Sequence, residues 1–538
     1  MTVRHLCIFS DCIGGGKSYN RIQMSNDGMN LFSNKIRNLE IILLSLILVG
    51  NAFFLQFNAF RGFNFFDMGA FLDASWRVFR GQKPYIDFIY FTGPVHLYMN
   101  AFFFSLVGFG KTAVLLHLIV VHSIVIVMTF LIARKYTSIS VSLLASLLTA
   151  TSFYWSLSHP WYDQSAHLWG ILAIGVTILK LPLDTTRKAF RTGLWCGVMV
   201  ILSFMTKTNI GAGYGLILFL VLLQSDEKKA SMLGYVAGAF WTTVFMLWVI
   251  RSPLQYAEQS ILAFKIPAQQ TSRLLPLLFF PTWFINYYWI AVAVVLFNTG
   301  LNWKKYQPFM TLFLGIFVLA IFSASTSAMK MSANIPLMGI HTTLAFVLLY
   351  KIRSLQNPEI RNVKNRISIA ILVLFTLYSI QVSAKRGLDL EAWTYGGLNP
   401  FGDYPLKTKQ VEGWLAPKES GEAVDHLVEF IDQHIPKTES LLVLTDLQIL
   451  YPLTKRDSYR GIPFIFSDGL NPPPGKQLEE VKNNILKNPP AWIVTHKNSF
   501  EKSMINFIIP YLGLRDFIMN SYAPVQSWNN YILLKKVA

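Results

Sequence analysis

Three aspartates stand out in residues 64–110, a stretch that follows the first strongly apolar segment of the chain. They are Asp67, Asp73 and Asp87, and basic side chains lie among them. A carboxylate can act as a general base toward an attacking hydroxyl group or amine. Ionisable groups are costly within a bilayer, so a cluster of them beside a spanning segment indicates a functional site.

Helical spacing separates the first two aspartates. If residues 67–79 form a helix, Asp73 has Arg77 four positions later, and this pairing is a sufficient structural reason for the acid. Asp67 has no basic partner at that spacing. It either caps the helix that follows, by accepting backbone N–H groups, or serves as a catalytic base, and the spacing favours neither.

A second candidate acid, Asp163, lies in the segment HPWYDQSAH, which is rich in side chains that hydrogen-bond or stack. Asp163 could be no more than a cap for a helix that starts near Ser165. The neighbouring His159 and Tyr162 are groups that a sugar or phosphate site would use. A metal site that includes His159, Asp163 and His167 is disfavoured, because their spacing is irregular across a helix start.

The basic candidate is Lys207, which lies in TKTNIGAG between two apolar segments. A long basic side chain at such a position often only extends to the membrane interface. The alternative is an ammonium that faces a lipid phosphate, with Gly211 and Gly213 allowing close approach of the backbone. Lys83 is another basic group on the same predicted side that could serve this electrostatic role.

The composition is that of an integral membrane protein. The 538 residues are 53% hydrophobic and only 14% charged, against the roughly 25% charged that is usual in soluble domains. The formal net charge of +18 does not predict nucleic-acid binding, because much of the Lys and Arg lies in short loops between apolar segments. The three cysteines, Cys7, Cys12 and Cys196, imply neither a disulfide framework nor a Cys-based zinc site.

The fold class predicted is a polytopic α-helical membrane protein with about eleven transmembrane helices. Apolar runs long enough to span, at about 20 residues each, occur near residues 39–57, 112–133, 139–157, 165–181, 191–206, 209–223, 232–250, 283–298, 308–325, 335–350 and 366–384.

Loop charges orient these spans, because short cytoplasmic loops are enriched in Lys and Arg. If the N-terminus is cytoplasmic and residues 94–107 lie at the outer interface, every strongly basic short loop falls on the cytoplasmic side. These loops include the pairs Arg134 and Lys135, and Lys228 and Lys229. If residues 94–107 spanned, all of these loops would lie outside. We therefore predict a multi-pass protein of the cytoplasmic membrane with its C-terminal part extracytoplasmic.

The expected domains are a basic cytoplasmic tail, residues 1–38; a transmembrane domain, residues 39–384, with a first outer loop at 58–111; and an extracytoplasmic α/β domain, residues 385–538. The tail contains IGGGKS, but it lacks the first glycine and the preceding strand of a phosphate-binding loop. In the C-terminal domain, EAVDHLVEFIDQHI and GKQLEEVKNNILKN predict amphipathic helices, whereas SLLVLTD, AWIVTH and NYILLKK predict short buried strands.

The stretch FDMGAFLDASWRVFRGQKPYIDFIYFTGPVHLYMNAFFFSLVG resembles the first outer loop of the GT-C glycosyltransferases, in the branch of the protein O-mannosyltransferases and lipid A aminoarabinose transferases. It contains an acid, a helix, a Gly-x-x-Pro-Tyr-x-Asp turn with Lys83, Tyr85 and Asp87, and an interfacial helix. The segments WYDQSAHLW and TKTNIGAG are similar to later motifs of this group. The resemblance implies a GT-C-like fold over most of residues 39–538.

By position, the resemblance implies that Asp67 is the catalytic acid, Asp163 the acid of the second loop and Lys207 the turn lysine near the lipid phosphate. Two departures are Met68, where many relatives have Glu, and Thr208, where Gly is frequent. The expected substrate-binding residues are Lys83, Tyr85, Asp87, His159, Tyr162, Asp163 and Lys207.

The activity implied is inverting transfer of a sugar from a polyprenyl-phosphate donor to a glycolipid, polysaccharide or protein acceptor at the outer face of the membrane. The expected partners are this donor, membrane lipid and an unidentified acceptor, without nucleic acid. No cofactor is expected: some distant GT-C members use a divalent cation, but acids are sparse on the predicted outer side. The alternatives are a transporter or flippase, or a non-catalytic component of an envelope glycan assembly system.

Overall fold

The computed structural model describes residues 26–154, 159–262, 283–299, 303–326, 335–355, 363–388, 402–461, 475–497 and 513–537. For residues 26–37, 66–67, 262, 283–286, 303, 324–326, 355, 386–388 and 475–478 it describes the backbone alone. The chain forms two compact units, Met1–Leu46 and Ile47–Ala538. Within the first, residues 26–46 are helical and form the beginning of α1 (Asn26–Ala59).

Each of the eleven segments predicted to span contains a helix in the described part of the chain. Besides α1, these helices are α4 (Lys111–Tyr136), α5 (Ile139–Ser152), α6 (Tyr162–Lys180), α7 (Thr186–Phe204), α8 (Thr208–Leu222), α9 (Lys228–Ile250), α13 (Trp283–Thr299), α14 (Phe309–Thr326), α15 (Met338–Leu355) and α16 (Val363–Leu388).

Five segments among the described residues are long and apolar enough to cross a membrane: Asn38–Ala59, Lys111–Tyr136, Lys228–Ile250, Ile335–Ser354 and Val363–Lys385. The chain is therefore a polytopic membrane protein, as predicted. The total of eleven spans and their orientation stay predictions.

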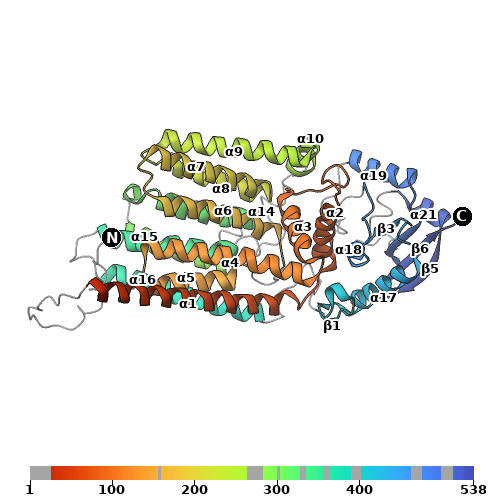
Figure 1. The fold of residues 1–538 in the computed structure, drawn as a ribbon, viewed down its shortest axis with the longest axis horizontal. Helices are drawn as coiled ribbons and strands as arrows, with labels where there is room; N and C mark the ends of the chain where they lie inside the picture. Colours follow the sequence, from red (N-terminus) through yellow and green to blue (C-terminus); the bar gives the residue numbers. More distant parts are fainter. Residues whose placement is uncertain are drawn as a thin grey trace, which may run out of the picture. The chain divides into compact units, whose positions relative to one another are not determined.

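Glycines bring α7 and α9 close together, and the two helices lie side by side in Figure 1. A Cβ atom on Gly193 or Gly197 would lie 2.0 or 2.2 Å from carbonyl oxygens of α9. A Cβ atom on Gly234 or Gly238 would lie 2.1 Å from carbonyl oxygens of α7. Both helices thus carry a Gly-x-x-x-Gly pattern at their contact, which is how helices in lipid bring their backbones into close packing.

Residues 58–111, the predicted first outer loop, contain a π-helical turn, η1 (Phe65–Gly69), then α2 (Ala70–Phe79) and α3 (Val95–Val107). The predicted pair of Asp73 and Arg77 is confirmed: Arg77 Nε lies 2.8 Å from Asp73 Oδ2, and both side chains are almost fully buried. Burial raises the pKa of Asp73, although Arg77 opposes this shift. The placement of α3 at the interface stays a prediction.

The C-terminal part contains a four-stranded sheet of order β3-β4-β6-β5. Its strands are β3 (Leu441–Leu444), β4 (Trp492–His496), β5 (Tyr522–Trp528) and β6 (Tyr531–Lys536). β3 and β4 are parallel, and the other two pairings are antiparallel. A second, two-stranded sheet pairs β1 (Tyr404–Pro405) with β2 (Leu415–Ala416). The helices are α17 (Lys418–His434), α18 (Leu450–Leu453), α19 (Gly475–Lys487) and α21 (Arg515–Ser521).

Residues 456–461 of this C-terminal part are hydrogen-bonded to the loop of residues 58–111. Trp76 Nε1 donates to the carbonyl oxygen of Arg456 at 2.8 Å, and Arg77 donates to that of Tyr459 at 2.7 Å. Ser458 Oγ donates to Asp73 Oδ1 at 2.5 Å. The buried ion pair of α2 thus receives a hydrogen bond from Ser458, 385 positions after Asp73, which fixes this loop against the C-terminal part.

Candidate functional site

The predicted catalytic acid, Asp67, lies in η1, immediately before α2. The backbone N–H groups of Met68 and Gly69 both donate to the carbonyl oxygen of Asn64, which forms the wide turn. Gly69 occupies the N-cap position of α2. Asp67 is therefore not the N-cap residue of α2 itself, and a capping role of its carboxylate within η1 stays a prediction. The side chain of Asp67 lies outside the described residues.

Phe71, four residues after Asp67, packs α2 against the second candidate segment. Its ring centroid lies 5.5 Å from that of Trp161 and 5.0 Å from that of Tyr162. These two aromatic residues directly precede Asp163 at the start of α6. The fold therefore brings the turn of Asp67 next to the segment of Asp163, which the sequence separates by almost a hundred residues.

Asp163 and Lys207 form an ion pair between the first turn of α6 and the residue before α8. Their side chains are 7% and 8% exposed, and the Lys207 ammonium lies 4.8 Å from the centroid of the Tyr162 ring. The interpretation of Lys207 as a side chain that only extends to the interface is therefore wrong. An ammonium held between a carboxylate and an aromatic face is a fixed positive charge in a largely water-excluded place.

A third segment, at the start of α3, contacts the backbone two residues before Lys207. The backbone N–H of Val95 donates to the carbonyl oxygen of Met205 at 3.1 Å. A Cβ atom on Gly93 would lie only 1.9 Å from the same oxygen. Only glycine at position 93 lets this turn approach the backbone just before Lys207 so closely.

A buried polar network, which the sequence reasoning missed, ties these segments together. Asn100 Nδ2 donates to Ser75 Oγ at 3.2 Å and lies 3.1 Å from His96 Nε2. His96 Nδ1 lies 3.1 Å from Ser165 Oγ. Since an amide nitrogen only donates, His96 Nε2 is the acceptor and its Nδ1 carries the proton. His117 Nδ1 bonds Asn100 Oδ1 at 2.5 Å.

This network ends on backbone oxygens of the two aromatic residues that pack together. Ser75 Oγ donates to the carbonyl oxygen of Phe71 at 2.8 Å, and Ser165 Oγ donates to that of Trp161 at 3.0 Å. It therefore fixes α2, which follows the Asp67 turn, relative to α6, which carries Asp163. The available signal was a pair of polar residues, His96 and Asn100, four positions apart in an otherwise apolar run.

Within the Gly-x-x-Pro-Tyr-x-Asp turn, the predicted residues Tyr85 and Asp87 form hydrogen bonds that stabilise the turn. Tyr85 has a left-handed φ of 69°, and its hydroxyl donates to the carbonyl oxygen of Thr92 at 2.5 Å. Asp87 Oδ2 accepts the backbone N–H of Lys83 at 2.8 Å. The side chain of Lys83 is exposed. Gln259 Nε2 donates to the carbonyl oxygen of Tyr85 at 3.3 Å, a contact that the sequence did not predict.

His159 is buried, and its ring centroid lies 4.1 Å from that of Trp161. Burial lowers the pKa of His159 to about 3, so its ring is neutral near pH 7. Among the described residues, no group of three or more His, Cys, Asp or Glu side chains could hold a metal ion.

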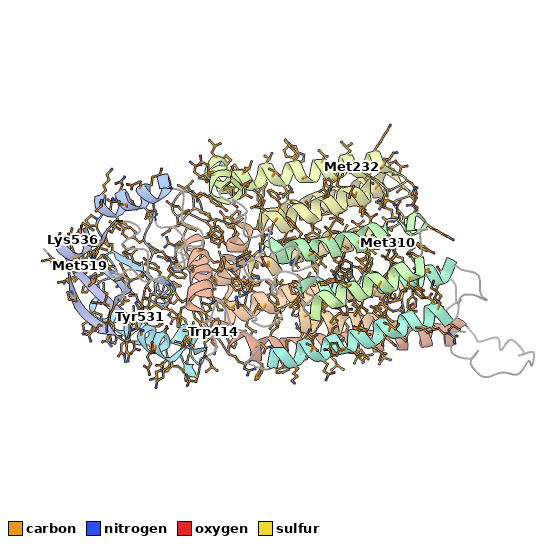
Figure 2. The ribbon with its side chains drawn as sticks, turned by 180° about the vertical axis from the view of Figure 1, so that it is seen from behind. Met232, Met310, Trp414, Met519, Tyr531 and Lys536 are labelled. Atoms are coloured by element: carbon orange, nitrogen blue, oxygen red, sulfur yellow. The ribbon has the colours of Figure 1, made fainter. Side chains whose placement is uncertain are left out.

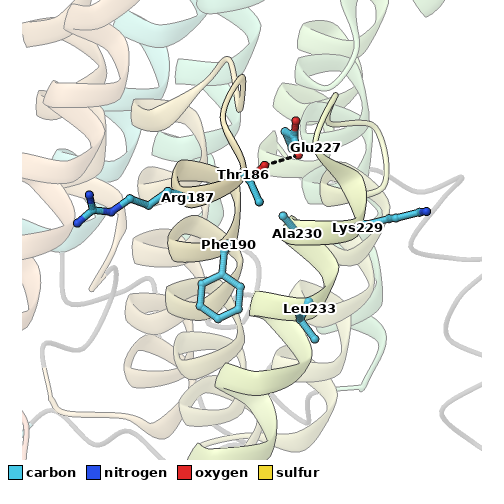
Figure 3. A pocket seen from close by; sticks show the side chains of 7 residues that line it. All are labelled: Thr186, Arg187, Phe190, Glu227, Lys229, Ala230 and Leu233. Carbon is cyan, nitrogen blue, oxygen red and sulfur yellow. Dashed lines mark hydrogen bonds between the residues drawn. The ribbon is translucent and has the colours of Figure 1, made fainter.

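A pocket of about 630 Å³ lies elsewhere, at the first turns of α7 and α9 (Figure 3). It is lined by Thr186, Arg187, Phe190, Glu227, Lys229, Ala230 and Leu233. The hydroxyl of Thr186 donates to Glu227 at 2.9 Å across it, while the Arg187 and Lys229 side chains point away to opposite sides. None of the predicted site residues lines this pocket, and Lys207 lies beyond the far end of α7, so we do not place the chemistry there.

Residues 91–250 match the family model described as dolichyl-phosphate-mannose-protein mannosyltransferase. No curated protein sequence matches this chain significantly. Among solved structures, the crystal structure of ArnT from Cupriavidus metallidurans bound to undecaprenyl phosphate has a TM-score of 0.54 at 14% identity, covering 93% of this chain and 98% of that one. Apo ArnT gives the same TM-score and identity, with 94% and 99% covered.

The oligosaccharyltransferase of Archaeoglobus fulgidus has a TM-score of 0.46 at 10% identity, covering 91% of this chain and 74% of that one. The family match includes Asp163 and Lys207 but begins after Asp67. The match to ArnT extends over nearly the whole of both chains and shows a shared fold. Together, the family match and this shared fold confirm the resemblance of the chain to GT-C glycosyltransferases of the mannosyltransferase and ArnT type.

Proposed function

We propose that this chain transfers a sugar from a polyprenyl-phosphate donor to an acceptor at the outer face of the cytoplasmic membrane. The observation that carries this proposal is the packing of the Asp67 turn, through Phe71, against the segment of the buried Asp163–Lys207 pair. The ArnT structure with undecaprenyl phosphate and the mannosyltransferase family match support a lipid-linked donor.

In this mechanism an acceptor hydroxyl group or amine attacks the anomeric carbon of the donor sugar. The new bond forms as the bond between the anomeric carbon and the phosphate oxygen breaks, so the configuration inverts in a single displacement. The Asp67 carboxylate takes the proton of the attacking group as general base. The electron pair leaves with the polyprenyl phosphate, and the Lys207 ammonium stabilises the charge that develops there.

Asp163 and Tyr162 have positioning roles in this proposal. The carboxylate and the ring fix the ammonium before the donor binds, so little reorganisation is needed during the reaction. His159, neutral because it is buried, is placed beside Trp161 to bind an uncharged polar group of the sugar. Tyr85 and Asp87 shape the turn, and the exposed Lys83 is a further cation for the donor phosphate.

The proposed orientation places the N-terminus in the cytoplasm and residues 385–538 outside. It can be tested in a variant that lacks the native cysteines, with a single cysteine at Lys437 or at Lys229. A membrane-impermeant maleimide added to intact cells should label the Lys437→Cys variant and not the Lys229→Cys variant. The reverse pattern would invert the orientation.

The proposed activity can be tested with purified protein in liposomes and a panel of labelled polyprenyl-phosphate pentoses and hexoses, together with a membrane extract as the source of acceptor. We expect transfer of label from at least one donor, with release of polyprenyl phosphate. If every donor stays intact while the protein remains folded, the proposed function is wrong.

A further inference from the structure

Polar side chains gather at one edge of the four-stranded sheet in the C-terminal part. Asp446 follows the end of β3, His496 ends β4, and Tyr531 begins β6. Because β3 and β4 are parallel and β6 is antiparallel to β4, these three positions lie at the same edge. This edge, at the carboxyl ends of the parallel strands, is where open α/β sheets bind ligands. We name Asp446, His496, Tyr531 and Ser420 the edge cluster.

Hydrogen bonds organise the edge cluster around the Asp446 carboxylate. The hydroxyl of Tyr531, which is labelled in Figure 2, donates to Asp446 Oδ1 at 3.2 Å. The hydroxyl groups of Ser420 and Tyr531 lie 3.3 Å apart. The His496 ring contacts the Tyr531 ring edge-on, with centroids 5.3 Å apart. Asp446, Ser420 and His496 are each partly exposed, whereas Tyr531 is buried.

His496 is suited to uncharged ligands. Burial lowers its pKa, and this effect outweighs the opposite influence of Asp446 and Glu419. Its imidazole is therefore neutral near pH 7, with one nitrogen that donates and one that accepts. The edge cluster thus offers a carboxylate acceptor, two hydroxyl groups and a neutral imidazole.

The same edge of the sheet lies against the turn that carries Asp67. A Cβ atom on Gly69 would lie 3.5 Å from Ile449 Cβ and 3.7 Å from the carbonyl oxygen of Asp446. Met68, next to Asp67, is buried at 2% exposure. The backbone of an edge-cluster residue and the backbone two positions after Asp67 are therefore immediate neighbours.

We infer that the edge cluster binds the acceptor of the transfer, and that this acceptor is a saccharide. The inference rests on the proposed function, because it assigns the acceptor side of the site where Asp67 would act. Neighbouring sugar hydroxyl groups can donate to the Asp446 carboxylate and exchange hydrogen bonds with Tyr531, Ser420 and His496.

A peptide acceptor fits the edge cluster less well. Peptides commonly dock by adding a strand to an exposed sheet edge. A peptide strand would pair along a lateral strand of this sheet, β3 or β5, whereas the edge cluster lies at the strand ends. The ligand must therefore be recognised by side chains, and the groups present are those that bind hydroxyl groups.

The test uses the full chain in lipid nanodiscs and saturation-transfer difference NMR, with methyl glycosides of common hexoses and pentoses and a Ser/Thr-containing decapeptide as probes. We expect at least one glycoside to give a signal with the wild type. That signal should fall at least fivefold in Asp446→Asn and in Tyr531→Phe. The matched control is Asp432→Asn, because Asp432 pairs with Lys437 on the surface in the last turn of α17, whereas Ser420 lies in its first turn.

Absence of any glycoside signal with the wild type would overturn the inference. An undiminished signal in Asp446→Asn, or binding of the decapeptide alone, would also overturn it. Where Asp446→Asn lowers the melting temperature, His496→Gln takes its place. Glycoside binding needs no donor, so the two assays fail separately. Binding without donor turnover contradicts the proposed function, and with it the acceptor role of the edge cluster, but not its saccharide binding. Turnover without binding contradicts this inference alone.

Discussion

The carboxylate of Asp163 and the ammonium of Lys207 neutralise each other in a place from which water is almost excluded. Removing one partner of such a pair leaves a buried charge, which costs about 3–5 kcal/mol. Lys207→Met should therefore lower the stability by about that amount. The double variant Asp163→Asn/Lys207→Met should recover most of the loss in thermal unfolding, yet remain inactive in sugar transfer. Activity in the double variant would show that the ammonium has no role in the reaction.

The stability should fall in mild acid because of His96 and His159. Burial lowers the pKa of each to about 3, below the value of about 6.5 in an unfolded chain. Between these values the unfolded chain binds protons that the native protein does not, so stability is fully present above pH 6.5 and is lost as the pH falls. At pH 5.5 the loss should be about 1.4 kcal/mol per histidine. Thermal unfolding between pH 7.5 and 5.5 measures it, and an unchanged pH dependence in His96→Gln would contradict this account.

The close contact of α7 and α9 should not tolerate a methyl group. In Gly238→Ala the new Cβ atom would meet the carbonyl oxygen of Leu194 at 2.1 Å, and the separation of the helices should cost about 1–3 kcal/mol. Gly50→Ala is the matched control, because nothing lies within 4 Å of a Cβ atom at position 50 in α1. That variant should be neutral or slightly stabilising, since alanine favours the helix. Equal melting temperatures of the two variants would refute the packing argument.

The hydroxyl of Ser458 should matter far more than the charge of the residue beside it. Ser458→Ala removes a hydrogen bond to the buried Asp73 carboxylate, which should cost about 1–3 kcal/mol. The neighbouring Asp457 pairs with Arg80 on the surface, with side chains 66% and 43% exposed. Asp457→Asn should therefore change the stability by less than about 1 kcal/mol. Denaturation of both variants, followed by limited proteolysis near residues 456–461, would show whether this contact holds the C-terminal part.

Local spacing predicted the parts of the fold that depend on near neighbours. The Asp73–Arg77 pair follows from four-residue spacing, and helices lie at all eleven apolar runs among the described residues. Partners that are far apart in the chain could not be predicted in this way. The sequence around Lys207 does not indicate that Asp163 is its partner, and the sequence around Asp73 does not indicate that Ser458 binds it. These pairs depend on how the helices pack, which hydropathy and spacing do not determine.

In the candidate site too, the sequence predicted which segments matter but not every contact between their residues. The residue types in 64–110, 159–163 and 206–208 marked the segments that the fold brings together. One single-residue interpretation was wrong, since Lys207 is buried in an ion pair and does not only extend to the interface. The network through His96 and Asn100 was missed because hydropathy counts an apolar run without weighing the polar residues inside it.

Asp67 is the proposed general base of sugar transfer, and single-turnover transfer from the labelled donor measures its contribution. The comparison is between Asp67→Asn, Asp432→Asn and the wild type, at equal abundance and equal melting temperature. Loss of a general base typically costs about a hundredfold to ten-thousandfold in rate. We predict a loss of this size in Asp67→Asn and a wild-type rate in Asp432→Asn. A wild-type rate in Asp67→Asn would contradict the account.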